Sequence, residues 1–542
     1  MIHLDIDVAF GFRDPAFDGF KWDVVFQAQC PLGFKPIRIL FEYLLLEFWR
    51  ILFKLLAFAR HIKKPPNAYC TLRGYFSTCE RNGVQFTKRG FFIVFAGILD
   101  RYCVLLEQGY LSCSKSSNIA LMKVLFVLEC ANKMTNGTSA TCVRFANELR
   151  KRGHEVRIIG VGDENTKDDP NYIGLKNFRF PIFQGIIEKE GFNFAHIDYE
   201  IIYKAVEWCD IVHYFLPFKL ANKTRLIAQA LHKPVTGAFH MQPQNITSAL
   251  GCGTKAWPNN ILYKSFNNYI YKKTKRIHCP SEMIATTLKN HGYLKNEYHV
   301  ISNGVSDFFH PIEIKKPEEL QGKFVVTMVG RLANEKRQDL IIKAVAKSRY
   351  NDYIQIILCG SGQNKKKYER LAKKVKLANP LIIKFCKPEE LREVLNYTDL
   401  YVHASTYEIE GISCIEAFAC GAVPIVSDSD ESATKSFSLN DKECVFKSGD
   451  ADSLCHRIEF MYENRMEKRK LSNRYLEFSK EFALPRMVDS MEEMLNLAKE
   501  DLEKGEDFPT LYPVPKDKRL AKKIFKKLLK KGVIKELPDY CK

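Results

Sequence analysis

Acidic residues are scarce in this sequence relative to basic ones. The 542 residues include 63 Asp and Glu against 82 Lys and Arg, which gives a net charge of +19. Such an excess favours an anionic partner: nucleic acid, a membrane surface or a negatively charged substrate. No segment is typical of a helix-turn-helix, a zinc finger or an aromatic RNA-binding platform, and much of the basic excess lies near the carboxyl terminus. We therefore expect no nucleic-acid partner.

Cysteines at metal-binding spacing are also missing, although the sequence contains 17 cysteines. There is no CxxC pair and no cluster of Cys and His at the spacing of a zinc site, so we expect no metal. Several cysteines, such as Cys359, Cys414 and Cys420, stand inside apolar patterns that are typical of buried positions. Scattered, unpaired cysteines indicate a reducing, cytoplasmic compartment.

A long uninterrupted hydrophobic run is missing as well. Residues 37–60 are rich in Leu and Phe, but Glu42, Glu47, Arg50 and Lys54 interrupt them. Each charge near the centre of a bilayer costs about 2.5 to 3.5 kcal/mol on insertion scales, so four charges disfavour a membrane-spanning helix. A helix lying in the membrane interface stays open. The amino terminus carries no tripartite secretory signal.

The first 121 residues differ in character from the rest. They contain 15 of the 38 phenylalanines, no methionine after Met1, and little periodicity. Met122 stands directly before a strand-like run. Two interpretations stay open: this N-terminal extension is non-native translation upstream of a start at Met122, or it contacts a membrane.

From Met122 onward, strand-like and helix-like segments alternate. KVLFVLE (residues 123–129) is a continuous apolar run typical of a buried parallel strand, and a helical segment and the strand VRIIGV follow it. This order predicts a parallel sheet with right-handed crossovers. A second series begins near Phe324. Its predicted strands are FVVTMV, IQIILCG, LIIKF, LYVHAS and AVPIVS. The sequence therefore predicts an α/β protein with two doubly wound, Rossmann-like domains.

The stretch EIEGISCIEAFACG, residues 408–421, is the most informative one. Glu408 and Glu416 stand eight positions apart, on either side of Gly411 and the predicted first turn of a helix. Gly421 is suited to end that helix. A helix N-terminus favours a phosphate, and ionised carboxylates accept hydrogen bonds well from sugar hydroxyls. The pattern predicts a nucleotide-sugar site.

This stretch resembles the Glu-x7-Glu motif of retaining glycosyltransferases in family 4, also called group 1. Three further segments resemble the family in the family's order: residues 122–161 as the first strand, loop and helix, residues 300–311 as the entry to the second domain, and residues 325–344 as its opening. Together the resemblance covers roughly residues 122–500.

The resemblance implies the GT-B fold, in which two domains face each other across a cleft and the donor nucleotide binds in the second domain. We expect five parts, with a helix that returns to the first domain and a basic amphipathic tail at the end. They are the extension (1–121), the acceptor-side domain (122–305), the nucleotide-sugar domain (306–475), the returning helix (476–505) and the tail (506–542).

The resemblance also implies the site residues of the second domain. Arg331 and Lys336 match the positions that bind the diphosphate. Glu416 matches the position that binds the ribose hydroxyls, and Glu408 the position near the donor sugar. Backbone groups complete the expected donor site, at Gly330, Gly411, Ile412 and Ser413.

Two candidates come from the first domain. His240 ends the predicted strand PVTGAFH, where the family often places a histidine close to the sugar and the acceptor. Gly137 lies in the first loop, where the family brings its backbone close to the diphosphate. The family often has paired glycines there, whereas this sequence has Asn136-Gly137-Thr138. We expect His240, Arg331, Lys336 and Glu408 to take part in catalysis.

The tail contains a basic amphipathic pattern. Residues 513–537 place apolar side chains on one helical face and lysines on the other. We expect residues 516–535 to contact an anionic membrane surface. The alternative is that the apolar face packs on the protein itself.

The sequence therefore predicts a retaining hexosyltransferase without a cofactor. Its expected donor substrate is a nucleotide-diphosphate sugar, and its acceptor a lipid or lipid-linked glycan at the cytosolic face of the inner membrane. Alternatives stay open: a soluble transferase that makes a free glycoside or polysaccharide, a nucleotide-sugar epimerase on a similar fold, and an inactive partner subunit.

Overall fold

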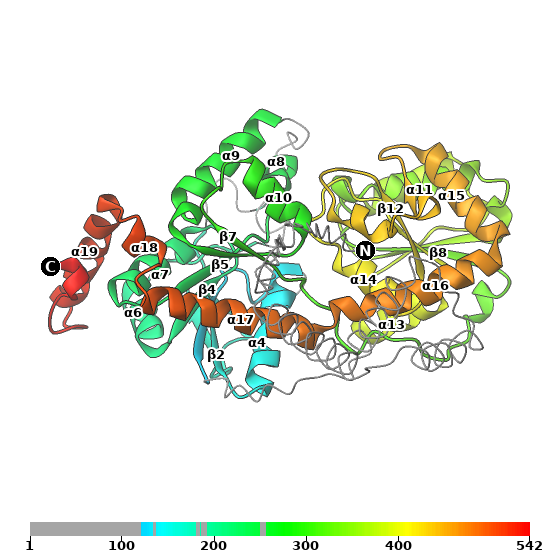
Figure 1. Ribbon diagram of the computed structural model, residues 1–542. Coiled ribbons are helices and arrows are strands. Elements are labelled where there is room, and N and C mark those ends of the chain that lie inside the picture. Colours follow the sequence, from blue (N-terminus) through cyan, green and yellow to red (C-terminus); the bar gives the residue numbers. More distant parts are fainter. Residues whose placement is uncertain (1–120, 134–136, 180–184, 186–191, 250–255) are drawn as a thin grey trace, which may run out of the picture. The chain divides into compact units, whose positions relative to one another are not determined.

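The computed structural model describes residues 121–133, 137–179, 185, 192–249 and 256–542. The predictions for the N-terminal extension lie outside the described residues, and so does Asn136. The described residues belong to one compact unit. Figure 1 shows its two parallel sheets, each accompanied by its own helices.

The first sheet has seven strands in the order β3-β2-β1-β4-β5-β6-β7, all parallel. Val124 pairs with Val156 on one side and with Ile211 on the other, so β1 is central and all four residues from Val124 to Val127 are fully buried. This burial explains the continuous apolar run of the first strand. The strands are β1 (Lys123–Val127), β2 (Glu155–Val161), β3 (Tyr172–Leu175), β4 (Ile211–Tyr214), β5 (Val235–Ala238), β6 (Arg276–Cys279) and β7 (Glu297–Val300).

The helices of this domain connect successive strands. Asp198 accepts hydrogen bonds from the backbone at the start of α6, and Ser281 does the same for α10. The helices are α4 (Gly137–Lys151), α6 (Tyr199–Trp208), α7 (Lys219–Ala230), α8 (Pro243–Ala249), α9 (Ala256–Tyr269) and α10 (Glu282–Asn290).

The second sheet has six parallel strands in the order β10-β9-β8-β11-β12-β13. The five predicted strands are present, and a sixth, β13, has only two residues and was not predicted. The strands are β8 (Phe324–Val329), β9 (Ile354–Cys359), β10 (Ile382–Lys384), β11 (Leu400–His403), β12 (Val423–Ser427) and β13 (Val445–Phe446). The helices are α11 (Gln338–Lys347), α12 (Lys365–Lys374), α13 (Pro388–Tyr397), α14 (Ile412–Ala419), α15 (Ala451–Glu463) and α16 (Arg465–Ser479). The predicted α/β class with two doubly wound domains is confirmed.

Helix α17 (Leu484–Glu503) packs on the first domain. Its Glu492 accepts a hydrogen bond from Arg152 at 2.9 Å and lies 3.0 Å from His154, both just after α4. Helix α17 also contacts β5. The exact domain boundaries stay predictions.

The C-terminal basic helix is present as α19 (Pro515–Lys530), which follows the short α18 (Phe508–Leu511). Its apolar residues Ala521, Ile524, Phe525 and Leu528 are buried, and α19 packs on α6 and α7. A buried ion pair between Arg225 and Asp517, at 2.6 Å, fixes the start of the helix. The apolar face is therefore covered by the protein, while most of the lysine face is exposed. Among the described residues, no helix combines the length and the apolar character needed to cross a membrane.

Candidate active site

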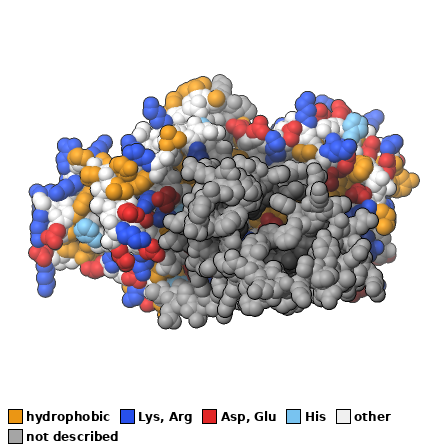
Figure 2. Space-filling model, viewed as in Figure 1, with side chains coloured by type: hydrophobic (Ala, Val, Ile, Leu, Met, Phe, Trp, Pro, Cys, Tyr) orange, Lys and Arg blue, Asp and Glu red, His pale blue; other side chains and the backbone are white. Residues whose placement is uncertain are grey.

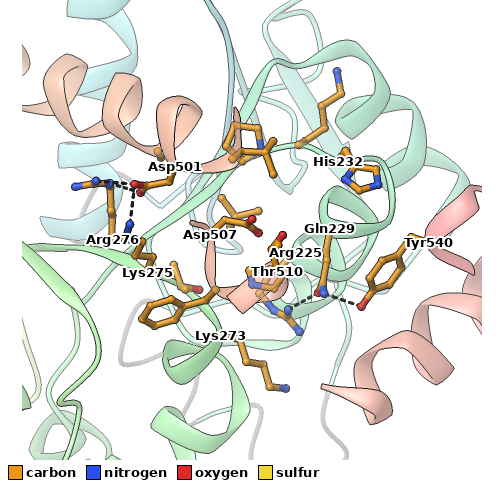
Figure 3. A pocket seen from close by; sticks show the side chains of 18 residues that line it. Arg225, Gln229, His232, Lys273, Lys275, Arg276, Asp501, Asp507, Thr510 and Tyr540 are labelled. Atoms are coloured by element: carbon orange, nitrogen blue, oxygen red, sulfur yellow. Dashed lines mark hydrogen bonds and ion pairs between the residues drawn. The ribbon is translucent and has the colours of Figure 1, made fainter. Parts of the chain in front are cut away.

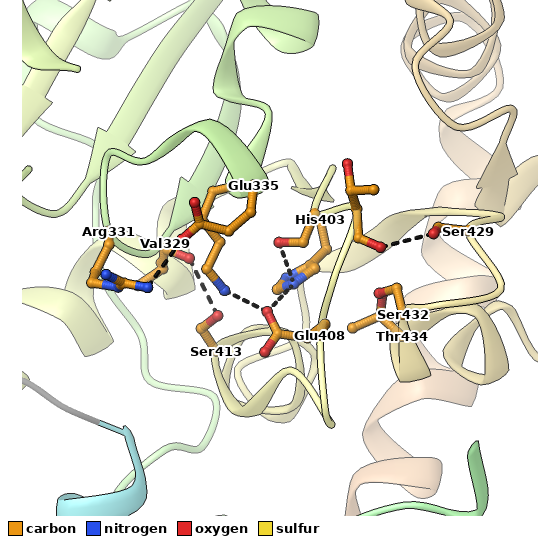
Figure 4. Close-up of polar contacts among 12 residues, drawn as sticks. Val329, Arg331, Glu335, His403, Glu408, Ser413, Ser429, Ser432 and Thr434 are labelled. Atoms are coloured by element: carbon orange, nitrogen blue, oxygen red, sulfur yellow. Dashed lines mark hydrogen bonds and ion pairs between the residues drawn. The ribbon is translucent and has the colours of Figure 1, made fainter. Parts of the chain in front are cut away.

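The predicted donor-binding residues of the second domain meet at one edge of its sheet. Gly330 and Arg331 directly follow β8, Lys336 ends a short 3-10 helix (Asn334–Lys336), and Glu408 lies in the loop between β11 and α14. Because β8 and β11 are parallel neighbours, their carboxyl ends lie side by side. Figure 4 shows the polar contacts among these residues.

An ion pair joins the two loops. Lys336 Nζ lies 2.5 Å from Glu408 Oε2, and the same oxygen lies 3.1 Å from His403 Nε2. Although burial opposes ionisation, Lys336 and His403 hold the pKa of Glu408 well below its usual range. Burial lowers the pKa of His403, against the influence of Glu408, so the imidazole is neutral near pH 7. The site therefore holds one carboxylate that faces an ammonium group and a neutral imidazole.

His403 was not predicted as a site residue. It ends β11, its side chain is fully buried, and Ser405 Oγ lies 3.1 Å from its Nε2. The only sequence signal was its place within the predicted strand LYVHAS, five residues before Glu408.

Arg331 lies in the same loop as Lys336. Its Nη2 lies 3.0 Å from Glu335 Oε1, and Gln338 donates a hydrogen bond to its carbonyl oxygen. The carbonyl of Glu335 accepts a hydrogen bond from the backbone of Thr406, which ties this loop to the loop that carries Glu408. Acidic partners thus hold two cations in place, as preorganised stabilisation of a diphosphate requires.

Helix α14 begins beside this cluster. Gly411 precedes its first residue, with a φ of +96°, and a Cβ atom there would lie 2.3 Å from Thr434 Cγ2. Glycine is therefore required for both backbone conformation and space. Ser413 Oγ accepts a hydrogen bond from Tyr401 and donates to the Val329 carbonyl, which fixes the first turn of the helix against β8 and β11. The first N–H groups of a helix have no partner within it, so Ile412 and Ser413 offer donors here.

Glu416 lies one turn further along α14. It is half-buried, and among the described residues no hydrogen-bond donor reaches its carboxylate. Burial raises its pKa to about 7, against the opposing charge of Arg144. A partly buried carboxyl group that lacks hydrogen-bond donors is stabilised when the hydroxyl groups of a ligand donate hydrogen bonds to it.

Glu410, which stands between the two motif glutamates, has a different role. Its carboxylate is buried and accepts hydrogen bonds from the backbone N–H of Asn303, at 3.1 Å, and from the Asn303 side chain. Burial raises its pKa to about 7, against these hydrogen bonds. Glu410 therefore fastens the second-domain motif to the segment that joins the two domains.

His240 lies just beyond β5 and is buried. Neither ring nitrogen has a hydrogen-bond partner among the described residues, and the ring packs on Phe215 and His278 at centroid distances of 5.5 and 4.8 Å. Burial holds its pKa well below the ordinary value, so it is neutral. No contact joins it directly to Lys336 or Glu408 within the described part of the chain.

The segment after His240 does approach the Glu408 loop. The carbonyl oxygen of Glu431 accepts hydrogen bonds from Gln242 Nε2, at 3.3 Å, and from the backbone N–H of Glu408, at 3.2 Å. Gln244 Nε2 also donates to the Glu431 carboxylate at 3.0 Å. The strand-end segment of the first domain is thus linked to the motif loop of the second.

Gly137 is the first residue of α4. A Cβ atom at this position would meet nothing within 4 Å, so no packing reason for glycine exists there. The structure does not bring Gly137 into hydrogen-bond contact with the donor-site residues, and it stays a prediction.

A cavity of about 70 Å³ lies elsewhere, at the amino ends of β5 and β6 (Figure 3). Several of its charged groups form ion pairs: Arg276 and Lys275 with Asp501 at 2.6 and 2.7 Å, and Arg225 with Asp517, which lies outside the lining. Because parallel strands hold their ligands at the carboxyl ends, this cavity is not at the expected reaction centre. Its ion pairs attach the C-terminal helices to the first domain.

The two sheets are the Rossmann-like halves of the GT-B fold, with a cation–carboxylate cluster beside a helix N-terminus in the second half. Two family descriptions match the chain: "Glycosyltransferase Family 4" over residues 135–307 and "Glycosyl transferases group 1" over residues 310–478. Together they cover more than half of the chain. The chain belongs to this family of glycosyltransferases, as the motifs implied.

Named relatives are similar over part of their length. Alpha-monoglucosyldiacylglycerol synthase of Streptococcus pneumoniae is 25% identical over 307 residues, which are 53% of this chain and 67% of that protein. The phosphatidylinositol N-acetylglucosaminyltransferase GPI3 subunit of Saccharomyces cerevisiae is 27% identical over 191 residues, which are 32% of this chain and 39% of that subunit.

Solved structures share the fold. The Anabaena protein HepE, in complex with UDP and glucose, has a TM-score of 0.52 at 16% identity, over 69% of this chain and all of that one. Sucrose-phosphate synthase from Thermosynechococcus elongatus has a TM-score of 0.55 at 15% identity, over 69% of this chain and 98% of that one. At such identities the likeness concerns the fold alone.

Proposed function

We propose that this glycosyltransferase moves a hexose from a nucleotide-diphosphate sugar to a hydroxyl of a lipid or lipid-linked glycan, with retention of the anomeric configuration. The single observation that carries the proposal is the Lys336–Glu408 ion pair beside Arg331 and the N-terminus of α14. It provides cations for a diphosphate and a carboxylate for sugar hydroxyls in one place.

In this scheme the donor replaces contacts that the two cations make with nearby acids. Lys336 exchanges its contact with Glu408 for the diphosphate, and Arg331 exchanges Glu335 for the same group. Glu408, ionised by its surroundings, then accepts hydrogen bonds from hexose hydroxyls, and Glu416 accepts them from the ribose. As the bond from the sugar to the outer phosphate breaks, negative charge grows on that phosphate, and the preorganised cations stabilise it.

The acceptor attacks the same face of the sugar that the diphosphate leaves. The acceptor hydroxyl forms the new bond to the anomeric carbon, and its proton passes to the departing phosphate oxygen. His240, neutral and without a partner among the described residues, orients this hydroxyl through one ring nitrogen. No nucleophilic side chain and no metal takes part in this scheme.

Two observations support a lipid acceptor at the cytoplasmic face of a membrane. The relatives named above are a glucosyldiacylglycerol synthase and a subunit named for phosphatidylinositol. The exposed lysines of α19, among them Lys523, Lys526 and Lys530, face solvent and suit an anionic lipid surface. Because most of the apolar face of α19 is buried, the helix would bind a membrane mainly through the charge of its lysines.

The test combines binding with a product assay. A panel of UDP-, GDP- and ADP-sugars is screened for an increase in the melting temperature, because a ligand of the native state stabilises it. The best donor is then incubated with diacylglycerol or sterol acceptors in mixed micelles, and the anomeric configuration of the product is determined by NMR. An α-linked product from an α-linked donor supports the proposal. Inversion, or an epimerised donor without any acceptor product, contradicts it.

A further inference from the structure

Helix α9 presents apolar side chains to solvent. Trp257 is 66% exposed and Ile261, one turn later, is 58% exposed, whereas Asn259, Tyr263 and Phe266 are buried against the domain. An amphipathic helix normally exposes polar residues on its outer face. Helix α9 instead exposes apolar side chains there, and such an exposed apolar surface is typical of a binding surface.

Neighbouring elements extend this apolar face. Tyr293 donates a hydrogen bond to the Tyr263 carbonyl at 2.7 Å, which holds the turn after α10 against α9, and the next residue, Leu294, is 78% exposed. Lys295 Nζ then lies 3.7 Å from the ring centre of Tyr512, just after α18. We call this the α9–α18 surface, and its exposed apolar residues are Trp257, Ile261, Leu294, Leu511 and Tyr512.

The charge along α9 is of one sign, whereas the exposed acids Glu503 and Glu506 lie just before α18. Residues 211–281 contain ten Lys and Arg and no Asp or Glu, and α9 lies inside this stretch. Lys264 and Lys295 are exposed beside the apolar residues, while Glu297, the next acid after Leu294, pairs with Arg276 at 2.8 Å. In Figure 2, hydrophobic side chains show on the side of the molecule where α9 and α18 lie, among Lys and Arg side chains and some Asp and Glu side chains.

We infer that the α9–α18 surface docks on the interface of a bilayer that contains anionic lipid. Tryptophan and tyrosine favour the region of the lipid headgroups, and lysines beside an apolar patch complement a negatively charged membrane. This inference rests on the proposed lipid acceptor. Helix α8, which packs on α9, begins three residues after His240, so docking brings the predicted acceptor site close to the membrane.

The surface differs in kind from the lysine face of α19. Helix α19 offers mainly charge, because most of its apolar side chains are buried, whereas the α9–α18 surface adds side chains that can enter the interface. Binding through α19 alone would disappear as salt screens the charges. Binding through the α9–α18 surface should persist in part at high salt, because salt does not screen the burial of apolar side chains.

The experiment is co-sedimentation of the full chain with phosphatidylglycerol–phosphatidylcholine vesicles at low and high salt. The double variant Trp257→Ser with Ile261→Ser should bind about tenfold more weakly or worse, mainly in the salt-resistant part, because it removes two apolar side chains. Met466→Ser is the matched control, since Met466 is 70% exposed on α16 of the second domain and its loss should change nothing. Both proteins should melt at the wild-type temperature, because the changed side chains are exposed.

Several outcomes would overturn the inference. Unchanged vesicle binding by the double variant rejects the surface, and so does a wild-type chain that fails to bind vesicles. Self-association of the wild type that the double variant lacks assigns the surface to a second copy instead. Donor turnover on a micellar acceptor, measured on the same preparations, is expected to be equal in wild type and variant. The turnover assay therefore tests the proposed reaction separately from membrane docking.

Discussion

Lys336 and Glu408 form an ion pair of 2.5 Å although they lie 72 positions apart in the sequence. One comes from the loop after β8 and the other from the loop after β11, and the parallel pairing of these two strands brings them together. The ion pair holds the ammonium group of Lys336 at a defined place in the site. This preorganisation is the physical basis of the predictions that follow.

Removing the cation should slow the reaction. Lys336→Met should lower kcat by about 10² to 10³, on the scale of losing one preorganised donor to the transition state. Lys343→Met is the control, because Lys343 pairs with Asp339 on α11 and has no contact with the motif loop. Steady-state kinetics with a saturating donor measure both. If Lys336→Met lowered kcat by less than about threefold, the role assigned to Lys336 would be contradicted.

Glu408 should make stability depend on pH in the acid range. Its pKa is held well below its usual range, so the folded state keeps the carboxylate charged after the unfolded state has taken up a proton. The contribution is full above an unfolded pKa of about 4.3 and is lost as the pH falls from there towards the folded pKa. The melting temperatures of wild type and Glu408→Gln should therefore differ by a constant amount above about pH 4.3 and approach each other as the pH falls below that value. Parallel curves over this range would refute the ionised state.

Glu416 should make donor binding depend on pH near neutrality. Burial raises its pKa to about 7, and the carboxylate that forms above this pH is the better acceptor for ribose hydroxyls. Donor affinity should rise as the pH increases from 6 to 8, and Glu416→Gln should weaken it about 10- to 100-fold and remove this rise. Isothermal titration with the donor nucleotide measures both effects.

Glu410 provides the control for that titration. Its pKa is also raised to about 7, but its carboxylate is already engaged by Asn303. Glu410→Gln should lower the melting temperature and leave the pH dependence of donor binding intact. If Glu410→Gln removed the rise instead, the titrating group would be misassigned.

Two glycines should respond oppositely to alanine. Gly411→Ala forces a side chain into a φ of +96° and within 2.3 Å of Thr434, so it should destabilise the fold by about 1 to 3 kcal/mol. Gly137→Ala has open space and should leave stability within about 0.5 kcal/mol. Chemical unfolding measures both. A loss of donor affinity in Gly137→Ala without a loss of stability would support the predicted contact between Gly137 and the diphosphate.

Much of the second domain could be predicted because its signals are local. The longer strands β8, β9 and β12 are apolar runs of five or six residues. Glu408, Gly411 and Glu416 belong to a single loop-helix unit whose spacing is visible in the sequence. Strand β13 was missed because Val445–Phe446 is too short to leave a pattern. His403 was missed because a buried histidine at a strand end has the same local pattern whether it packs in a core or contacts a carboxylate.

The sequence by itself determined the alternation of strands and helices, the glycine before α14, the two motif carboxylates and the amphipathic pattern of α19, since each depends on residues within a few turns of one another. Only the tertiary structure decided which acid holds which cation, and that the apolar face of α19 packs on α6 and α7. Those outcomes depend on segments far apart in sequence, such as Arg225 and Asp517, which are separated by 292 positions. A periodic pattern defines a face of a helix, but what covers that face is decided by the rest of the fold.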